Sequence, residues 1–261
     1  MRVGLISGSG SYRWPGLAGA EPATISTAYG TTEVTSGRVA GVEVVHLSRH
    51  GAGHVRLSHQ VTHRANLAAL RAAGVDCLIS LTVCGALDPA LVPGSLVVFD
   101  DLYFPGNRLP DGSPCTWFDQ PAGPGRGHWI ADRPFSEPLR RALVAAGSGQ
   151  VPVTDGGCYG HVDGPRFNTR TEVAALAAAG VSAISQTAGP EVVLAGEAEL
   201  PMALVGFVTD YANGVIECPE PVEALLARMA SSTAAFAALI GAALPGLPAP
   251  APAGVVYRFA P

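Results

Sequence analysis

The stretch VEVVHLSRHGAGHVRLSHQVTHRANLAALRAAGVDCLISLTVCG (42–85) contains, in order, a strand, a basic loop, a helix and a second strand. The runs 42–48 and 77–85 are short, apolar and bounded by glycine or charged residues, and segment 63–74 has helical spacing. Further strands are expected at 3–7, 95–100, 182–187 and 202–210, and further helices at 136–147, 170–180, 190–200 and 220–243. This alternation predicts an α/β fold with a sheet flanked by helices.

Glycine and proline mark the expected ends and loops. We expect Gly74, Gly147 and Gly180 to follow three of the helices as C′ residues. Segment 105–129 is rich in both residues, which predicts a long surface loop. The last helix is followed by PGLPAPAPAGV, which predicts an extended and poorly packed tail. We therefore divide the chain into one domain, residues 1–245, and a tail, residues 246–261.

The composition excludes several classes of protein. The net charge is −5 and only 14% of residues are charged, so binding of nucleic acid through a basic face is not expected. The sequence contains no uninterrupted apolar run of about 18 residues, the length that would indicate a membrane span. The N-terminus MRVGLISGSG indicates a first strand rather than a signal peptide, which favours a cytoplasmic location. The five cysteines include no CxxC pair, so a metal cage or a disulfide framework is not expected.

The basic loop is the clearest functional signal. Residues 47–66 hold four of the seven histidines and three arginines of an acidic chain. Such a concentration indicates a local anion site rather than a basic surface. Arg49 offers a planar fork that matches a phosphate, and His50 offers a shorter donor beside it. The alternative is a solvated turn.

Other candidate groups also stand at the ends of expected strands, where open α/β sheets bind ligands. The loop SGSGS (7–11) can hold phosphate oxygens through hydroxyls and backbone N–H groups, although a tight turn explains it equally well. TVCG (82–85) is also explained by ordinary strand termination. Phe167 precedes a helix with an expected Thr169–Glu172 capping box, and it could stack on a flat ring or belong to the core. Asp210 could donate a proton to a heterocycle if burial raised its pKa, or it could cap a turn.

Taken together, the motifs resemble one family. From Val3 to about Gly214 the chain carries, in order, VGLISGSG, SRHGAGH, VTHRAN, LTVCGAL, PGSLVVFDD, DGPRFNTRTE, QTAGPEVVLAGEAELP and VTDYAN. This set resembles the trimeric purine nucleoside phosphorylase family, and within it the 5′-methylthioadenosine phosphorylase branch. The resemblance implies a single-domain fold with a twisted, mixed central sheet, a barrel-like extension and surrounding helices. It also implies a homotrimer with sites near the subunit interfaces.

The resemblance assigns roles to individual positions. The positions that match phosphate-binding residues are Ser9, Arg49, His50, Thr82 and Thr187. Val83 and Gln186 match residues that line the ribose, and Phe167 matches the residue that packs on the base. Asp210 matches the carboxylate that faces N7 of the purine. His128 matches a residue that a neighbouring subunit supplies near the 5′ substituent. Inorganic phosphate is a co-substrate, and no cofactor or metal is implied.

The implied reaction is that of a pentosyltransferase. Phosphate attacks the anomeric carbon of a purine nucleoside and releases the base and a ribose 1-phosphate. Arg49 and His50 hold the anion on the face opposite the base, and Asp210 protonates the departing ring. The favoured substrate is 5′-methylthioadenosine or a related 5′-modified nucleoside.

Two departures from the family pattern keep alternatives open. Ala212 stands where the adenine-directed branch carries a second aspartate, and Asn213 beside it could face a 6-oxo group. Gln186 stands where the family generally has methionine, which predicts altered contacts with the sugar hydroxyls. The alternatives are a 6-oxopurine enzyme acting on inosine, guanosine or methylthioinosine, a phosphate-independent nucleosidase, and a nucleoside-binding protein without catalysis.

Overall fold

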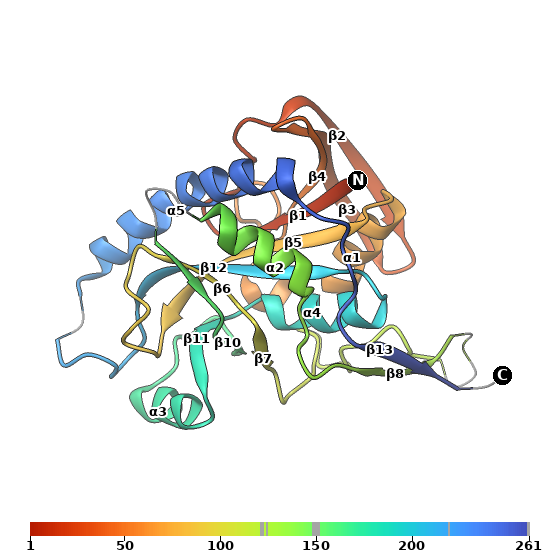
Figure 1. Cartoon of the computed structure of the whole chain (residues 1–261). Coiled ribbons are helices and arrows are strands. Elements are labelled where there is room, and N and C mark those ends of the chain that lie inside the picture. Colours follow the sequence, from red (N-terminus) through yellow and green to blue (C-terminus); the bar gives the residue numbers. More distant parts are fainter. Residues whose placement is uncertain (121–122, 124, 148–151, 219, 260–261) are drawn as a thin grey trace.

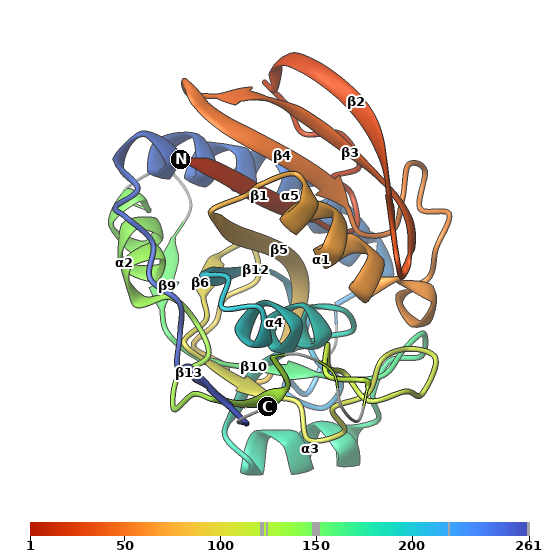
Figure 2. The same cartoon turned by 90° about the vertical axis from the view of Figure 1, so that its right-hand side faces the viewer.

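The centre of the fold is a set of parallel strands. The computed structural model describes residues 1–120, 123, 125–147, 152–218 and 220–259. In it β1 (Arg2–Ser7) lies between β4 (Val42–Ser48) and β5 (Cys77–Ala86), parallel to both. The antiparallel strands β2 (Ala18–Thr27) and β3 (Gly30–Val39) extend the sheet beyond β4, at the top of Figure 2. Because β1, β4 and β5 are parallel, the residues that follow them meet at one edge of the sheet.

The far half of β5 belongs to a closed circuit of strands. β12 (Met202–Tyr211) runs parallel to β5, and β6 (Leu96–Val98) runs antiparallel to β12. β6 continues into β7 (Asp101–Tyr103), and these two strands pair with β9 (Val153–Asp155) and β10 (Cys158–His161). β11 (Val181–Ser185) joins β10 and returns to the end of β5. This circuit is the expected barrel-like extension.

The helices cover both faces of the sheet, and the strands alternate between them. Ile6 and Leu78 point into one hydrophobic core, whereas Leu5 and Ile79 point into the other, as the two-residue period of a strand requires. The first core lies under α1 (His63–Ala72) and α4 (Ala188–Glu197), and the second lies under α2 (Glu137–Ala146) and α5 (Val222–Ala243). Figures 1 and 2 show the two helix pairs, with α3 (Arg170–Ala178) apart from them beside β11. Short 3-10 turns occur at η1 (Ser58–Gln60) and η2 (Leu244–Gly246).

By length and composition, one helix is apolar enough to cross a membrane. This segment, Val222–Gly246, contains α5 and has a mean hydropathy of 1.4 in its most apolar window. Phe236, Leu239 and Ile240 of α5 are nevertheless buried in the second core. In that window 28% of the residues are buried, and the core helix of a globular domain can meet the same test of length and composition.

The sequence predicted β1, β4, β5, β6, β11, β12 and the five helices, and the structure confirms them with shifts at the ends, whereas it did not predict β2, β3, β7, β9 and β10. The helix predicted at 190–200 begins at Ala188 and ends at Glu197, and the strand predicted at 95–100 spans only Leu96–Val98. The capping box of α3 is present, because Thr169 accepts from the backbone N–H of Glu172 and Glu172 accepts from that of Thr169.

The prediction that Gly147 is a C′ residue was wrong. Gly74 and Gly180 have the positive φ of C′ glycines, at 72° and 88°, but Gly147 is the C-cap of α2 with φ −73°. A side chain at Gly147 would collide with Val153 at the start of β9. Glycine is therefore required there for the close approach of a strand and not for a left-handed turn.

The C-terminal tail is also more ordered than the sequence predicted. Its residues Val255–Arg258 form β13, which pairs antiparallel with β8 (Gly127–Ile130) in a separate two-stranded sheet. Trp129 of β8 donates from Nε1 to the carbonyl of Ala253 at 2.9 Å. Its ring lies where a side chain at Gly196 of α4 would be. The pairing was not predicted because its two strands are far apart in the sequence. Residues 121, 122 and 124 of the predicted long loop and residues 260 and 261 of the tail lie outside the described part.

Two glycine-to-alanine variants should have opposite effects on stability. Gly241→Ala in α5 places a methyl group where no atom lies within 4 Å, so the free energy of unfolding should rise by about 0.5–1 kcal/mol. Gly196→Ala places the same group against the Trp129 ring, so the free energy of unfolding should fall by about 1–3 kcal/mol. Urea unfolding at one protein concentration measures both changes. Equal effects of the two substitutions would show that β8 does not pack on α4.

Candidate active site

A cavity of about 320 Å³ opens where several strands end. Its walls come from the residues that follow β1, β4 and β11, from the ends of β5 and β12, and from the loop that precedes α3. Its volume lies in the range of small-molecule sites. Every site residue predicted from the sequence lines it except His128: Ser9, Arg49, His50, Thr82, Val83, Phe167, Gln186, Thr187, Asp210 and Asn213.

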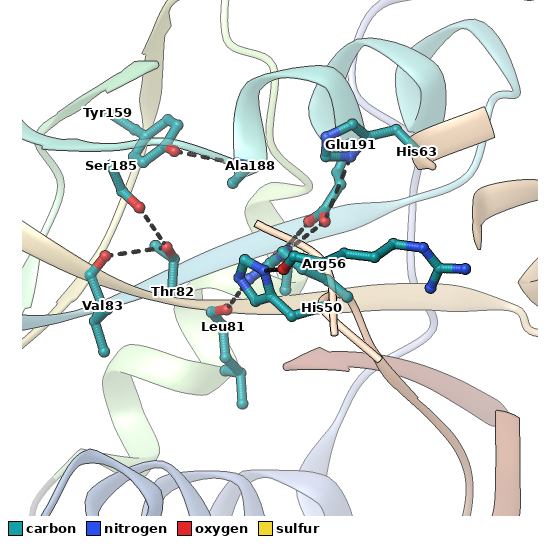
Figure 3. A network of polar contacts seen from close by, with 12 residues as sticks. His50, Arg56, His63, Leu81, Thr82, Val83, Tyr159, Ser185, Ala188 and Glu191 are labelled. Carbon is teal, nitrogen blue, oxygen red and sulfur yellow. Dashed lines mark hydrogen bonds and ion pairs between the residues drawn. The ribbon is translucent and has the colours of Figure 1, made fainter. Parts of the chain in front are cut away.

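The guanidinium of Arg49 is held by a buried carboxylate. Its Nε and Nη2 donate to the two carboxylate oxygens of Glu191 at 2.7 and 2.8 Å, and both side chains are only 1% exposed. Nη2 also donates to Ser80 Oγ at 2.7 Å, and Nη1 donates to the carbonyl of Leu81 at 2.8 Å. Figure 3 shows Glu191 reaching from α4 toward this network.

This pairing differs from the expected role of Arg49. The sequence suggested that the fork of the guanidinium faces an anion, but the fork faces Glu191. Nη1 has a second N–H, and Nη1 lies beside Gly8, where a side chain would come within 2.7 Å of it. Arg49 can therefore offer an anion in the cavity one N–H rather than two.

His50 lies next to Arg49 with one ring nitrogen already bonded. Its Nδ1 lies 2.9 Å from the carbonyl of Arg56, which can only accept, so Nδ1 carries the proton. Burial lowers the pKa of His50 to about 4, and the charge of Arg49 acts in the same direction. The neutral ring therefore presents an unprotonated Nε2, which accepts a hydrogen bond. This corrects the expectation that His50 adds a donor to the site.

A second imidazole supports the first. His54 stacks on His50 with ring centroids 4.3 Å apart and planes 13° apart. His54 Nδ1 lies 2.9 Å from the hydroxyl of Tyr12, in the loop after β1. These contacts tie the loop after β4 to the loop after β1.

Hydroxyl groups complete this corner of the cavity. Thr82 Oγ1 lies 2.8 Å from Ser185 Oγ and 3.1 Å from the carbonyl of Val83, as Figure 3 shows. Thr187 is the N-cap residue of α4, and its buried side chain makes no capping hydrogen bond. Ser9 is half-buried after β1. The N-terminus of α4 and these hydroxyls form a corner suited to an anion.

Asp210 lines the cavity near the end of β12, where it pairs with Gly85, three residues beyond Thr82 on β5. Its Oδ1 accepts from Thr209 Oγ1 at 2.7 Å. Burial raises the pKa of the Asp210 carboxyl, although the Thr209 hydrogen bond and the charge of Arg228 oppose the shift. A raised pKa favours the protonated form of this carboxyl, which could deliver its proton to a ligand.

The residues around Asp210 differ in exposure. Ala212 is 8% exposed and packs with Val173 and Ile184 in a small apolar cluster. Asn213 is exposed, and its Nδ2 donates to the carbonyl of Asn168 at 2.8 Å. Phe167 is 64% exposed, so its ring is open to a ligand rather than buried in the core.

Some contributions to the cavity were not apparent in the sequence. Glu191 stands in an apolar helix, and a carboxylate among apolar residues was the available signal. Leu225 and Met229 of α5 line the cavity from a helix to which the sequence assigned no site residue. Among the described residues, no group of three histidine, cysteine or acidic side chains is placed to hold a metal ion.

His128 is not among the residues that line the cavity. It lies on β8, paired with Tyr257 of β13, and its ring packs edge-on against Phe259 at 5.2 Å. The contacts within this chain therefore give His128 no role in the cavity.

Comparisons with known proteins agree with this geometry. A family model described as the phosphorylase superfamily matches residues 2–245. The 6-oxopurine nucleoside phosphorylase of Pyrococcus furiosus is 33% identical over 253 residues, which cover 95% of this chain and 93% of that protein. The S-methyl-5′-thioadenosine phosphorylase of Mycolicibacterium smegmatis is 39% identical over 217 residues, covering 82% and 79%. Among solved structures, methylthioadenosine phosphorylase from Schistosoma mansoni in complex with adenine matches with a TM-score of 0.83 and 28% identity, covering 94% and 91%.

The state of His50 predicts which oxyanions bind. An acceptor at Nε2 favours an anion that carries a hydroxyl, as phosphate and arsenate do at neutral pH, whereas sulfate has none. We expect sulfate to compete with phosphate at least about tenfold more weakly than arsenate does, because sulfate would place an oxygen against a lone pair. The inhibition constants of sulfate and arsenate, each measured against phosphate at pH 7.5, give this ratio. The ratio should fall toward one as the pH falls toward 4 and Nε2 gains a proton. His50→Asn should reduce the ratio and the exposed His59→Asn should not. Equal inhibition by sulfate and arsenate would contradict the assignment.

Proposed function

The chain belongs to the phosphorylase superfamily, and on that premise we propose that it cleaves a purine nucleoside with inorganic phosphate. The products are the free base and a ribose 1-phosphate, so the enzyme is a pentosyltransferase. The leading substrate is 5′-methylthioadenosine or a related 5′-modified nucleoside. The observation that carries the proposal is one cavity lined both by an anion corner at Ser9, His50 and Thr187 and by a carboxyl of raised pKa, Asp210, near the end of β12.

The proposed reaction uses the anion corner and Asp210 together. Phosphate bound near the N-terminus of α4 attacks the anomeric carbon from the face opposite the base, and the bond from that carbon to the base breaks. The departing purine takes a proton from Asp210, while Phe167 packs on its ring. Hydroxyls, one N–H of Arg49 and the helix terminus hold the anion in line with the bond that breaks. Phosphate is the co-substrate, and this chemistry requires no redox cofactor.

A second candidate is a 6-oxopurine phosphorylase. Ala212 packs in an apolar cluster and carries no carboxyl. Among the described residues that line the cavity, Asp210 is therefore the one acidic residue. Position 212 therefore supplies no second carboxylate to accept from a 6-amino group while Asp210 donates to N7. The relative from Pyrococcus furiosus is named for 6-oxopurines and the one from Mycolicibacterium smegmatis for methylthioadenosine, so both candidates have a precedent.

We also propose that the chain forms a homotrimer in the cytoplasm, in which a neighbouring subunit brings His128 near the 5′ end of the nucleoside. Two observations support the assembly. His128 lies outside the cavity of its own chain, and the sheet of β8 and β13 exposes Ile130, Val255 and Tyr257. The cysteines are all free, which suits a reducing compartment.

A panel of six nucleosides tests the proposal. Adenosine, inosine, guanosine, 2′-deoxyadenosine, methylthioadenosine and methylthioinosine are incubated with and without phosphate, and base release is ranked by kcat/KM. We expect phosphate-dependent release that is fastest with methylthioadenosine. Faster release from inosine than from adenosine, and from methylthioinosine than from methylthioadenosine, would select the second candidate. Release that persists without phosphate would indicate a nucleosidase. No release from any nucleoside would refute the proposal and leave a binding protein.

Substitution of Asp210 tests its role as the acid. Asp210→Asn keeps the shape of the side chain but removes its acidic proton, so kcat should fall by about 10²- to 10⁴-fold with little change in KM. The wild-type kcat should fall as the pH rises through the pKa of this carboxyl, since only the protonated form donates. The variant should lose that dependence, and the exposed Asp132→Asn should keep both activity and profile. A variant with full kcat and the wild-type pH profile would remove Asp210 from the mechanism.

A further inference from the structure

The amide of Gln186 connects two loops of the cavity wall. Its Oε1 accepts from Ser58 Oγ at 2.9 Å, and its Nε2 donates to the carbonyl of Arg166 at 3.1 Å. Ser58 begins η1, and Arg166 belongs to the loop before α3. The sequence predicted that Gln186 contacts the sugar, but the structure directs one of its N–H groups and its oxygen to protein.

We propose that Gln186 is a positioning residue that braces these two loops and so sets the affinity for the nucleoside. The inference rests on the proposed function for the identity of the ligand, whereas the brace itself rests on contacts within this chain. Both loops carry residues that line the cavity, Leu57 and Ser58 in one and Pro165 and Phe167 in the other. Gln186 itself follows β11, so the brace is anchored in the sheet.

The Arg166 side of the brace determines where Phe167 lies. The side chain of Arg166 pairs with both carboxylate oxygens of Glu172 at 2.8 and 2.6 Å, and Glu172 caps α3 through the backbone N–H of Thr169 at 2.8 Å. Phe167 stands between these anchored residues. Because its ring is 64% exposed, packing contributes little to its position, and the hydrogen bonds to its neighbours hold the loop.

The Ser58 side of the brace leads to the anion corner. Ser58 is two residues from Arg56, whose carbonyl accepts from Nδ1 of His50 at 2.9 Å. The loop that orients His50 is therefore tied through Gln186 to the loop that carries Phe167. A shift of either loop would change the distance between the two walls that a nucleoside has to bridge.

Close packing around the amide supports a structural purpose. A side chain at Gly164 would collide with Oε1 of Gln186 and with Oγ of Ser58. The backbone of the loop before α3 thus lies directly on the bridge. A glycine at this place permits the contact, because any other residue would push the loop outward.

The test replaces the bridging amide with a side chain of similar length. Gln186→Met removes both hydrogen bonds and keeps most of the volume. We expect KM for the nucleoside to rise roughly five- to tenfold, from the loss of hydrogen bonds that order the loops, with kcat and KM for phosphate within about twofold. The exposed Gln120→Met is the matched control, and it should change none of the three constants.

Hydrogen exchange tests the brace without activity. The backbone amides of residues 164–168 and 57–61 should exchange faster in Gln186→Met than in the wild type, and at the wild-type rate in Gln120→Met. If the chain catalyses no phosphorolysis, this measurement alone still decides whether the brace exists. Wild-type exchange in both loops would overturn the proposal, and so would a rise in KM for phosphate as large as that for the nucleoside.

A double-mutant cycle separates the brace from a direct sugar contact. Ser58→Ala removes one end of the bridge and leaves Gln186 free to contact a sugar. If the brace sets affinity, Ser58→Ala raises KM for the nucleoside, and adding it to Gln186→Met has little further effect. If the double variant raised KM for the nucleoside by the full product of the two single effects, the proposal would be overturned.

Discussion

The buried ion pair between Arg49 and Glu191 is the interaction on which the cavity depends. It joins the end of β4 to the first turn of α4, and through Ser80 it also engages β5. Removing one partner of such a pair leaves an uncompensated buried charge, at a cost of about 3–5 kcal/mol. Because α4 also supplies the N-terminus that faces the anion corner, the pair fixes the helix dipole relative to the strands.

The same pair explains how an acidic protein can hold an anion without a basic surface. Glu191 pairs with the charge of Arg49, and the imidazoles of His50 and His63 are neutral. Burial lowers the pKa of His63 to about 3 and that of His50 to about 4. His63 Nδ1 lies 3.9 Å from Glu191, so at neutral pH this contact is not a second ion pair. An anion in this corner is therefore recognised by directed hydrogen bonds and the helix terminus, which select for geometry and protonation state.

The sequence revealed the parts of the site that follow apolar strands and missed those that depend on distant contacts. Ser9, Arg49 and Asp210 could be found because each stands directly after or at the end of a buried strand. The hairpin of β2 and β3 was not predicted, because β2 is mostly exposed and shows no apolar alternation. The partners of Gln186 lie 128 and 20 residues away, so no local pattern shows that its amide is already bonded. The protonation state of His50 likewise depends on the carbonyl of Arg56, which has no signature in the side-chain sequence.

The two departures from the family pattern, Ala212 and Gln186, lie where a substitution changes the free energy of folding little. Ala212 contributes to a small apolar cluster, and Gln186 forms neutral hydrogen bonds between half-exposed loops. A neutral hydrogen bond contributes about 0.5–1.5 kcal/mol, whereas a buried charge left without its partner costs several times more. Arg49 or Glu191 can therefore not be replaced alone without a large loss of stability, whereas Ala212 and Gln186 can. It follows that substitutions at Gln186 and Ala212 cost the fold less than substitutions in the ion pair that supports the anion corner.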